Sequence, residues 1–243
     1  MINFIKKIIY RLLDKFFQNK SLNGQAKRKK FNNLEDLISS HFKDNFNHPC
    51  RETLYEALKL GKNKELTIIE TGSSAWGTNS SVLFDSYVNS FGGSLISVDI
   101  RSYPMLHLKF QCSSKSNFYC NDSLVFLNKL ILNNDEKKNK KLVYLDSFDV
   151  DWENPFPAMQ HGLNEFIALE KHLVSGDIIL IDDTPKNYDI LNKVHGKVKN
   201  LKFKELEASK LIPGKGALIK DYINKKKSCE ILEHSYQLLL KFI

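Results

Sequence analysis

Carboxylates that follow two apolar segments are the side chains best placed to do chemistry in this sequence. The segment 141–146 ends on Asp146, and the segment 176–182 ends on Asp182 with Asp183 next to it. If both segments are neighbouring strands of one sheet, their carboxylates meet at the same edge. Three carboxylates in one pocket repel each other unless a cation lies between them, and oxygen ligands select a hard ion such as Mg²⁺. The sequence therefore predicts a divalent-metal site here, with a helix N-cap after the second segment as the alternative.

A glycine-rich turn forms a second group of candidate residues. It begins at Glu70 and Gly72 and ends at Gly77. A nucleotide phosphate loop requires Gly-Lys-Ser/Thr, but Thr78 follows the last glycine, and the dinucleotide fingerprint requires a glycine where Ser74 stands. The acid before the turn suits a cationic or amine-bearing ligand better than a pyrophosphate. A plain turn between a strand and a helix remains the alternative.

Two further acids follow the next two apolar segments in order. Asp99 ends the second segment. In doubly wound folds, an acid at this position accepts hydrogen bonds from ribose hydroxyls. Asp122 and Ser123 follow the third segment, and Asp122 is also a good helix N-cap. The acidic turn and the two later acids, taken together, indicate a ligand-binding site much more specifically than any one of them alone.

The elements that must position these residues alternate between strand and helix. Strands are expected at 65–70, 94–99, 116–120, 141–146 and 176–182, and helices at 50–61, 78–90, 122–133 and 156–174. A charged loop is expected at 135–141, and a terminal antiparallel hairpin at 202–207 and 216–222. Such alternation indicates a mostly parallel sheet with helices on both faces, in which ligands bind beyond the carboxyl ends of the strands.

With these residues in this order, the sequence resembles the class I S-adenosylmethionine-dependent methyltransferases over roughly residues 50–223. The resemblance implies an α/β fold: a doubly wound, mostly parallel, seven-stranded Rossmann-like sheet. It also implies that the glycine turn holds the methionine part of the cofactor, and that the later acids hold the ribose and lie near the adenine. The implied cofactor-binding residues are Glu70, Gly72, Ser73, Gly77, Asp99, Asp122 and Ser123. The turn departs from the family pattern in having only two glycines, with Trp76 between them.

The acids after the fourth and fifth segments are similar to those of metal-dependent O-methyltransferases of the catechol type and the macrocin-type sugar enzymes. The resemblance implies that Asp146, Asp182 and Asp183 bind Mg²⁺ or a similar divalent cation, which chelates adjacent acceptor hydroxyls and lowers the pKa of one of them. A base then removes the proton. Three residues remain open for the catalytic role of base: Asp149, Asp151 and His161. A polar loop for the first two, and a packing role for the histidine, are the alternatives.

The positive charge of the chain is confined to its first thirty residues. The formal net charge is +8, and residues 1–30 hold nine basic residues and one acid, which accounts for all of it. Apolar residues recur there at helical spacing, opposite a cationic face: Ile2, Ile5, Ile9, Leu12 and Phe16. This pattern predicts an amphipathic helix that lies on an anionic membrane surface, or one that docks on its own domain or on a second subunit. We therefore expect a basic helix and polar linker at 1–30 and a catalytic domain at 31–243.

The remaining composition narrows the class of protein. Four cysteines without a C-x-x-C pair argue against a thiolate zinc site and a disulfide framework, and the electrically neutral body disfavours nucleic acid as a partner. We expect a cytoplasmic enzyme, with peripheral contact to the inner membrane face through residues 1–17 and a homo-oligomer both left open. The predicted function is O-methylation of a small hydroxylated acceptor, such as a sugar of a surface polysaccharide or a natural product. A non-catalytic scaffold and a hydroxylase-named branch of the fold are the alternatives.

Overall fold

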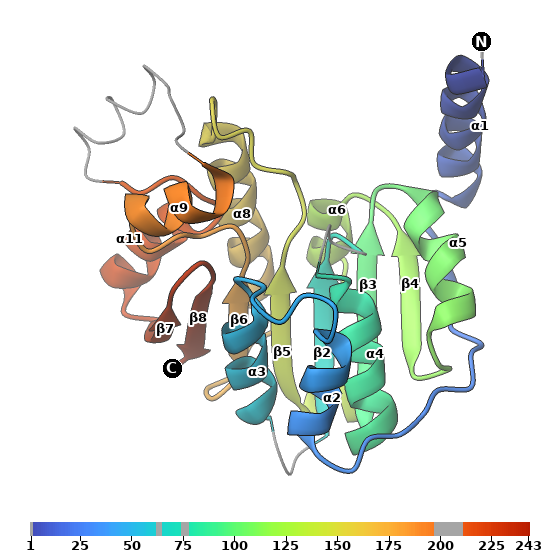
Figure 1. The fold of residues 1–243 in the computed structure, drawn as a ribbon, viewed down its shortest axis with the longest axis horizontal. Coiled ribbons are helices and arrows are strands. Elements are labelled where there is room, and N and C mark those ends of the chain that lie inside the picture. The colour runs from blue at the N-terminus through green and yellow to red at the C-terminus, as the bar shows by residue number, and fades with distance from the viewer. Residues whose placement is uncertain (1, 62–64, 74–77, 197–210) are drawn as a thin grey trace.

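An eight-stranded, mostly parallel sheet forms the centre of the computed structural model, which describes residues 2–61, 65–73, 78–196 and 211–243 (Figure 1). The strand order is β1-β4-β3-β2-β5-β6-β8-β7. The strands are β1 (Lys20–Asn23), β2 (Leu66–Thr71), β3 (Gly93–Asp99), β4 (Ser116–Cys120), β5 (Lys140–Leu145), β6 (Ile178–Ile181), β7 (Cys229–His234) and β8 (Leu238–Phe242). The doubly wound α/β architecture predicted from the alternating pattern is confirmed.

Helices cover both faces of this sheet. They are α1 (Ile2–Phe17), α2 (Leu34–His41), α3 (Arg51–Lys59), α4 (Ser80–Phe91), α5 (Ser102–Gln111), α6 (Ser123–Asn128), α7 (Asn134–Lys138), α8 (Phe156–Glu170), α9 (Tyr188–His195) and α11 (Ala217–Lys226). Successive strand residues point to opposite faces, so Ile68 belongs to a core beneath α2 to α5 while Ile69 belongs to a second core beneath α6, α8 and α11. The central strands are buried on both faces, which explains their largely apolar sequences.

The sheet topology brings the acidic strand ends together. The chain builds β2, β3 and β4 outward in one direction and then returns to place β5 and β6 on the other side of β2. Leu145 pairs with Thr71 on one side and with Ile181 on the other. The residues that follow, Asp146 and Asp182, therefore leave the sheet at the same level. This reversal of strand order is the place where ligands bind in open α/β sheets.

The predicted terminal hairpin was wrong in its position. Residues 216–222 were expected to form a strand, but they belong to α11, whose buried Ile219 and Ile223 lie four residues apart on one helical face. The hairpin is formed instead by β7 and β8, which pair antiparallel next to β6. Residues 202–207 lie outside the described part of the chain.

Two further segments differ from the sequence expectation. The expected linker at 18–30 contains β1, which pairs antiparallel with β4 and makes an eighth strand at the sheet edge. The expected helix at 122–133 is shorter, because α6 ends at Asn128. The charged segment after it was expected as a loop, but it forms α7, where Asn133 and Glu136 make a reciprocal capping box.

The N-terminal helix α1 is present as predicted and projects from the edge of the molecule beside α5 (Figure 1). The Asp14 carboxylate accepts hydrogen bonds from the backbone N–H and the hydroxyl of Ser102, both at the start of α5. This contact fixes one end of α1 against the body. Among the described residues, no helix combines the length and hydrophobicity needed to cross a membrane.

Candidate functional site

Two adjoining cavities open beyond the carboxyl ends of the central strands. The larger, of about 640 Å³, is lined by the three acids that follow β5 and β6, together with Ser73, His48 and His195. The smaller, of about 380 Å³, is lined by the residues that follow β3 and β4. Both cavities share four lining residues: Gly72, Arg101, Asp146 and Asp149. The arrangement can therefore hold two molecules that meet at the end of β2. We call the larger the acid cavity and the smaller, after the ligand expected from the sequence, the nucleoside cavity.

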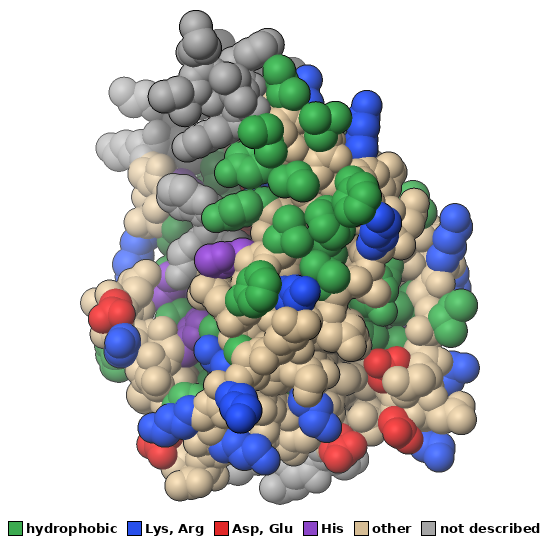
Figure 2. Space-filling model, turned by 90° about the vertical axis from the view of Figure 1, so that its right-hand side faces the viewer, with side chains coloured by type: hydrophobic (Ala, Val, Ile, Leu, Met, Phe, Trp, Pro, Cys, Tyr) green, Lys and Arg blue, Asp and Glu red, His purple; other side chains and the backbone are tan. Residues whose placement is uncertain are grey.

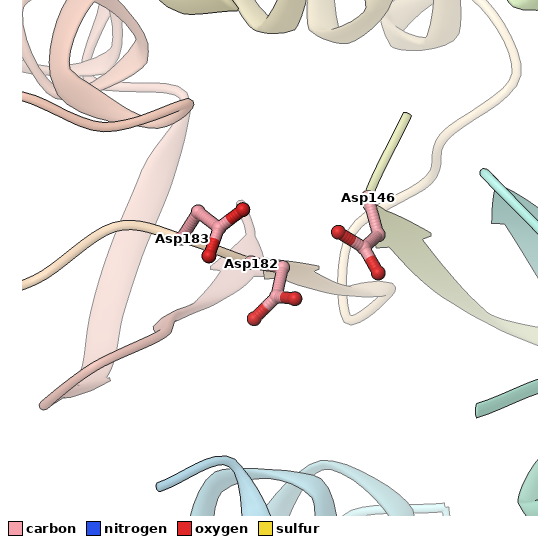
Figure 3. Close-up of side chains that lie close together, drawn as sticks. All are labelled: Asp146, Asp182 and Asp183. Atoms are coloured by element: carbon pink, nitrogen blue, oxygen red, sulfur yellow. The ribbon is translucent and has the colours of Figure 1, made fainter. Parts of the chain in front are cut away.

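The three predicted metal ligands converge in the acid cavity. Asp146 follows β5, whereas Asp182 and Asp183 follow β6 and face it across the gap between the strand ends (Figure 3). One carboxylate oxygen from each residue lies within 4.8 Å of the others. The spacing of acids at two strand ends thus correctly identified a cluster that the parallel register assembles.

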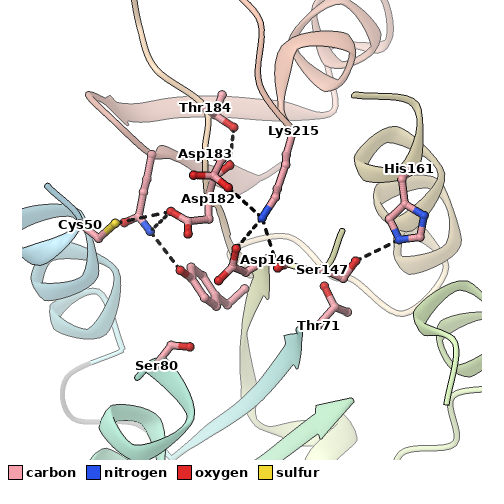
Figure 4. A network of polar contacts seen from close by, with 12 residues as sticks. Cys50, Thr71, Ser80, Asp146, Ser147, His161, Asp182, Asp183, Thr184 and Lys215 are labelled. Carbon is pink, nitrogen blue, oxygen red and sulfur yellow. Dashed lines mark hydrogen bonds and ion pairs between the residues drawn. The ribbon is translucent and has the colours of Figure 1, made fainter. Parts of the chain in front are cut away.

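A lysine that the sequence analysis missed contacts two of these acids. The Lys215 ammonium lies 2.5 Å from an Asp146 oxygen and 3.1 Å from an Asp183 oxygen (Figure 4). Its side chain is buried, with 3% of its surface exposed. The sequence signal that could have revealed this lysine is the pair of glycines that flank it. A Cβ at Gly214 would lie 2.3 Å from the Asp183 carbonyl oxygen, and a Cβ at Gly216 would lie 2.8 Å from the Thr184 side chain. The glycines let this segment approach the end of β6 closely.

Burial and mutual repulsion dominate the electrostatics of the cluster. Burial, with the charge of Asp182, raises the pKa of Asp146 well above its ordinary value, although Lys215 opposes the shift. Burial also disfavours the charged form of Asp183, but Lys215 and the Tyr236 hydroxyl outweigh it and hold that pKa below its ordinary value. Burial disfavours the charged form of Lys215 as well, yet the surrounding acids raise its pKa. The ammonium therefore stays charged.

The residues present fit a divalent cation. Within the described part of the chain, the buried Oδ2 atom of Asp146 has no hydrogen-bond partner, so one acceptor in this cluster is left for another ligand. Three carboxylates and one ammonium leave two negative charges when all are ionised. An all-oxygen set of this kind suits a hard ion.

Neighbouring side chains hold each acid in place. The Gln237 amide donates to Asp182 at 2.7 Å, and the Cys50 thiol lies 3.5 Å from the same oxygen. The Tyr236 hydroxyl donates to Asp183. Partners that orient ligands in this way are typical of metal sites.

After β2, the predicted turn is present where the structure describes it, and its binding of a cofactor stays a prediction. Gly72 has a φ of +82°, and a Cβ there would lie 2.4 Å from the Asp146 carbonyl oxygen. Any larger residue would separate the ends of β2 and β5, so this position requires glycine. Gly77 lies outside the described residues. Ser73 lines the acid cavity, and its backbone N–H donates to Asp99 at 3.1 Å.

Besides Gly72, three predicted cofactor residues line the nucleoside cavity: Asp99, Asp122 and Ser123. The guanidinium of Arg101 donates one hydrogen bond to each Asp99 oxygen, both at 2.9 Å. Asp122 also caps α6 by accepting from the Val125 N–H, which was its alternative role.

Glu70 lies beneath the turn and lines neither cavity among the described residues. It is fully buried, and its oxygens accept hydrogen bonds from the hydroxyls of Ser80, Ser81 and Ser97. Burial raises its pKa to about 7, against the effect of these hydrogen bonds. In this arrangement the acid joins the turn to α4 and β3 rather than facing a ligand.

The three candidate bases lie in different places. Asp149 lines both cavities. His161 lines only the nucleoside cavity, where its ring stacks on Phe148 and its Nε2 lies 2.9 Å from the Ser147 hydroxyl. Asp151 lines neither cavity and accepts a hydrogen bond from the Glu153 N–H. The base assignment stays a prediction, and geometry favours Asp149 among these three.

Comparisons with known proteins identify the fold but no close relative. No known family profile matches the sequence, and no curated protein matches it. Among solved structures, MycE, a methyltransferase from the mycinamycin biosynthetic pathway in complex with Mg and SAH, superposes with a TM-score of 0.56 at 17% identity over 88% of this chain. The chain covers only 55% of MycE, about half its length. Cofactor-bound Rv0187 from MTB superposes with a TM-score of 0.51 at 10% identity, over 86% of this chain and 87% of that one. The resemblance found at the strand ends is thus confirmed at the level of the fold: the chain has the Rossmann-like fold of S-adenosylmethionine-dependent methyltransferases.

Proposed function

We propose that this protein is an S-adenosylmethionine-dependent O-methyltransferase that uses a divalent cation and acts on a small acceptor with adjacent hydroxyls. The observation that carries the proposal is the junction of the two cavities. Asp99 and Asp122 line one, the three acids line the other, and Gly72 and Asp146 border both. A methyl donor and an acceptor held in these cavities would meet at the end of β2.

The residues of the chain have distinct roles in this proposal. Asp99 accepts hydrogen bonds from the ribose hydroxyls of the cofactor in place of one of its hydrogen bonds from Arg101. Asp122 and Ser123 lie beside the adenine. Gly72 gives the methionine part room at the turn. Holding both reactants in adjoining cavities supplies much of the rate through proximity.

Asp146, Asp182 and Asp183 would hold Mg²⁺ or a similar cation. When bound, the cation lowers the pKa of an acceptor hydroxyl, and the sulfonium of the cofactor provides an electrophilic methyl group. Lys215 neutralises part of the acid cluster and bridges Asp146 and Asp183. MycE was also solved with Mg, SAH and mycinamycin VI, which supports a small-molecule acceptor for this chain.

A direct assay tests this function. The full chain is incubated with S-adenosylmethionine, Mg²⁺ and either methyl α-rhamnoside or 3,4-dihydroxybenzoate, and S-adenosylhomocysteine formation is followed. Thermal unfolding with S-adenosylhomocysteine serves as the acceptor-independent readout, since a ligand at a hundred times its Kd stabilises a protein by about 2.7 kcal/mol. No stabilisation by S-adenosylhomocysteine would remove the cofactor from the proposal.

Lys215 gives the non-catalytic alternative a specific basis. Because the ammonium already pairs with two of the acids, the cluster can persist without a metal. A scaffold of this kind would bind its partner surface yet show neither S-adenosylhomocysteine stabilisation nor divalent-cation binding.

We also propose that α1 attaches the protein to an anionic membrane surface. Leu12 and Phe16 on α1 are 62% and 63% exposed, and Tyr103 and Phe110 on α5 are 55% and 70% exposed. Figure 2 looks onto this side of the molecule, where hydrophobic side chains gather and Lys and Arg side chains are scattered around and below them. An apolar surface beside cationic side chains is typical of helices that lie in a lipid interface. A second copy of the chain is the competing partner, and sedimentation with and without vesicles separates the two.

A further inference from the structure

One histidine in the acid cavity has no role in the function proposed above. His195 is the last residue of α9, and it lines the acid cavity beside Tyr236. Its ring packs on Trp152, with 4.5 Å between ring centroids. The side chain is solvent-accessible, so an acceptor in the cavity can reach it.

Hydrogen bonds determine which nitrogen of His195 carries the proton. The Tyr236 hydroxyl has one hydrogen and donates it to Asp183, since a carboxylate can only accept. The His195 Nε2 atom lies 2.8 Å from the same hydroxyl oxygen. That oxygen has already used its hydrogen, so it must accept, and Nε2 must be the donor. The neutral ring therefore keeps its lone pair on Nδ1.

The geometry around Asp183 agrees with this chain of hydrogen bonds. The Lys215 ammonium lies 3.1 Å from the Oδ2 atom of Asp183, while the Tyr236 hydroxyl donates to its Oδ1 atom. Burial lowers the pKa of His195 by more than the nearby acids raise it, which favours the neutral ring near pH 7.

The other histidine of the acid cavity has the same tautomer, but its Nδ1 lone pair is already used. The Nδ1 atom of His48 accepts a hydrogen bond from the Cys50 N–H at 3.2 Å. A neutral ring with its lone pair used in this way carries its proton on Nε2, so its second nitrogen donates. His161 lines only the nucleoside cavity. Of these three histidines, His195 alone both lines the acid cavity and has a nitrogen lone pair that its described hydrogen bonds leave for a substrate.

We propose that His195 is the general base of the methyl transfer, with Tyr236 and Asp183 as the positioning residues that fix its tautomer. This inference rests on the proposed O-methyltransferase function. An acceptor O–H bond breaks as an N–H bond forms at Nδ1, and the oxygen electron pair forms a C–O bond to the methyl carbon while the C–S bond breaks. The imidazolium then releases its proton to solvent. A neutral imidazole with an unused nitrogen lone pair is a typical general base.

Nitrogen NMR of the full chain labelled with ¹⁵N-histidine tests the tautomer without any acceptor. The chain has seven histidines, and the pair of signals lost in His195→Gln identifies those of His195. We expect a protonated Nε2 and an unprotonated Nδ1 in the wild type, and a mixture of tautomers in Tyr236→Phe. A proton on Nδ1 of the wild-type ring would overturn the inference.

Kinetics test the catalytic step. With methyl α-rhamnoside or 3,4-dihydroxybenzoate as the acceptor probe, we expect His195→Gln to lower kcat by about 10²- to 10⁴-fold. The affinities for S-adenosylhomocysteine and Mg²⁺ should stay within about threefold of the wild type, on the scale of the small effects of surface substitutions. His172→Gln is the matched control, because this histidine contacts the Leu127 carbonyl away from both cavities. A kcat unchanged in His195→Gln would overturn the inference and leave the proposed function standing.

The two claims fail in different ways. If S-adenosylhomocysteine does not bind the wild type, the proposed function fails, and with it the catalytic role of His195, whatever the tautomer. If the cofactor binds and neither probe is methylated, the tautomer measurement decides the inference by itself.

Discussion

The strand-end site and the N-terminal helix use charge in opposite ways. At the strand ends, three acids and Lys215 lie within one cavity, and the side chains of Asp146 and Lys215 are only 6% and 3% exposed. On α1, basic residues and apolar residues are both directed to solvent. Buried like charges persist only where a partner or a ligand offsets their repulsion, whereas exposed charges cost little and act through long-range attraction. In the proposed function, the first region therefore holds one bound ion, and the second contacts an extended surface.

The largest effect should come from removing one acid of the cluster. Asp182→Asn keeps the shape of the side chain but removes one of the two net charges, so we expect loss of divalent-cation binding and a fall in methyl transfer of about 10³-fold, or about 4 kcal/mol. Calorimetric titration with Mg²⁺ and the methyl-transfer assay measure the two effects. Asp221→Asn on the exposed face of α11 is the control. Cation binding equal to wild type in Asp182→Asn would break the contrast between the regions.

The protonation of the buried Glu70 should have a smaller effect, on the order of 3 kcal/mol, on the free energy of unfolding between low and high pH. Its pKa rises from an ordinary 4.5 to about 7 in the folded protein. The folded state thus binds the proton more tightly than the unfolded state. This contribution is fully present below about pH 4.5 and is lost as the pH rises through about 7, at 1.36 kcal/mol per pKa unit.

Urea unfolding at pH 5 and pH 8 measures this contribution. Glu70→Gln has no carboxyl to titrate, so its free energy of unfolding should change less between the two pH values than that of the wild type. Equal changes in both proteins would show that Glu70 is not protonated on burial.

Substitution of Asp99 in the nucleoside cavity should give the next largest effect, on the affinity for the cofactor. Asp99→Asn removes a charged acceptor, and hydrogen bonds to charged groups contribute about 1.5–3 kcal/mol. We expect S-adenosylhomocysteine to bind about 10- to 100-fold more weakly while Mg²⁺ affinity stays unchanged. Calorimetric titration with each ligand checks this. A parallel loss of both affinities would mean that the two cavities are not separate binding sites.

The smallest effect should come from single charges on α1. Each basic residue near an anionic membrane contributes about 1 kcal/mol, so Arg11→Gln or Lys15→Gln should weaken binding to phosphatidylserine-containing vesicles by about fivefold. Vesicle co-sedimentation measures the binding, and uncharged phosphatidylcholine vesicles are the control. S-adenosylhomocysteine affinity should not change. If the variants alter the oligomeric state instead, α1 docks on a second copy of the chain.

Sequence patterns predicted the parallel core and its acidic strand ends well, because short buried strands have mostly apolar sequences and the residue after each strand lies at the edge of the sheet where ligands bind. The sequence patterns failed where contacts with distant parts of the chain determine the secondary structure. β1 forms because its edge pairs with β4, and residues 216–222 become helical because Ile219 and Ile223 pack into the core. Lys215 and Tyr236 are far from the acids in sequence, so only the fold could place them in the site.

The most direct test of the central claim is the position of a bound cation. Crystals of the full chain grown with S-adenosylhomocysteine and Mn²⁺, a substitute for Mg²⁺ with an anomalous signal, would reveal it. We predict one anomalous peak between the carboxylates of Asp146, Asp182 and Asp183, with S-adenosylhomocysteine against Asp99. No peak at this cluster, with the Lys215 ammonium still bridging Asp146 and Asp183, would contradict the account.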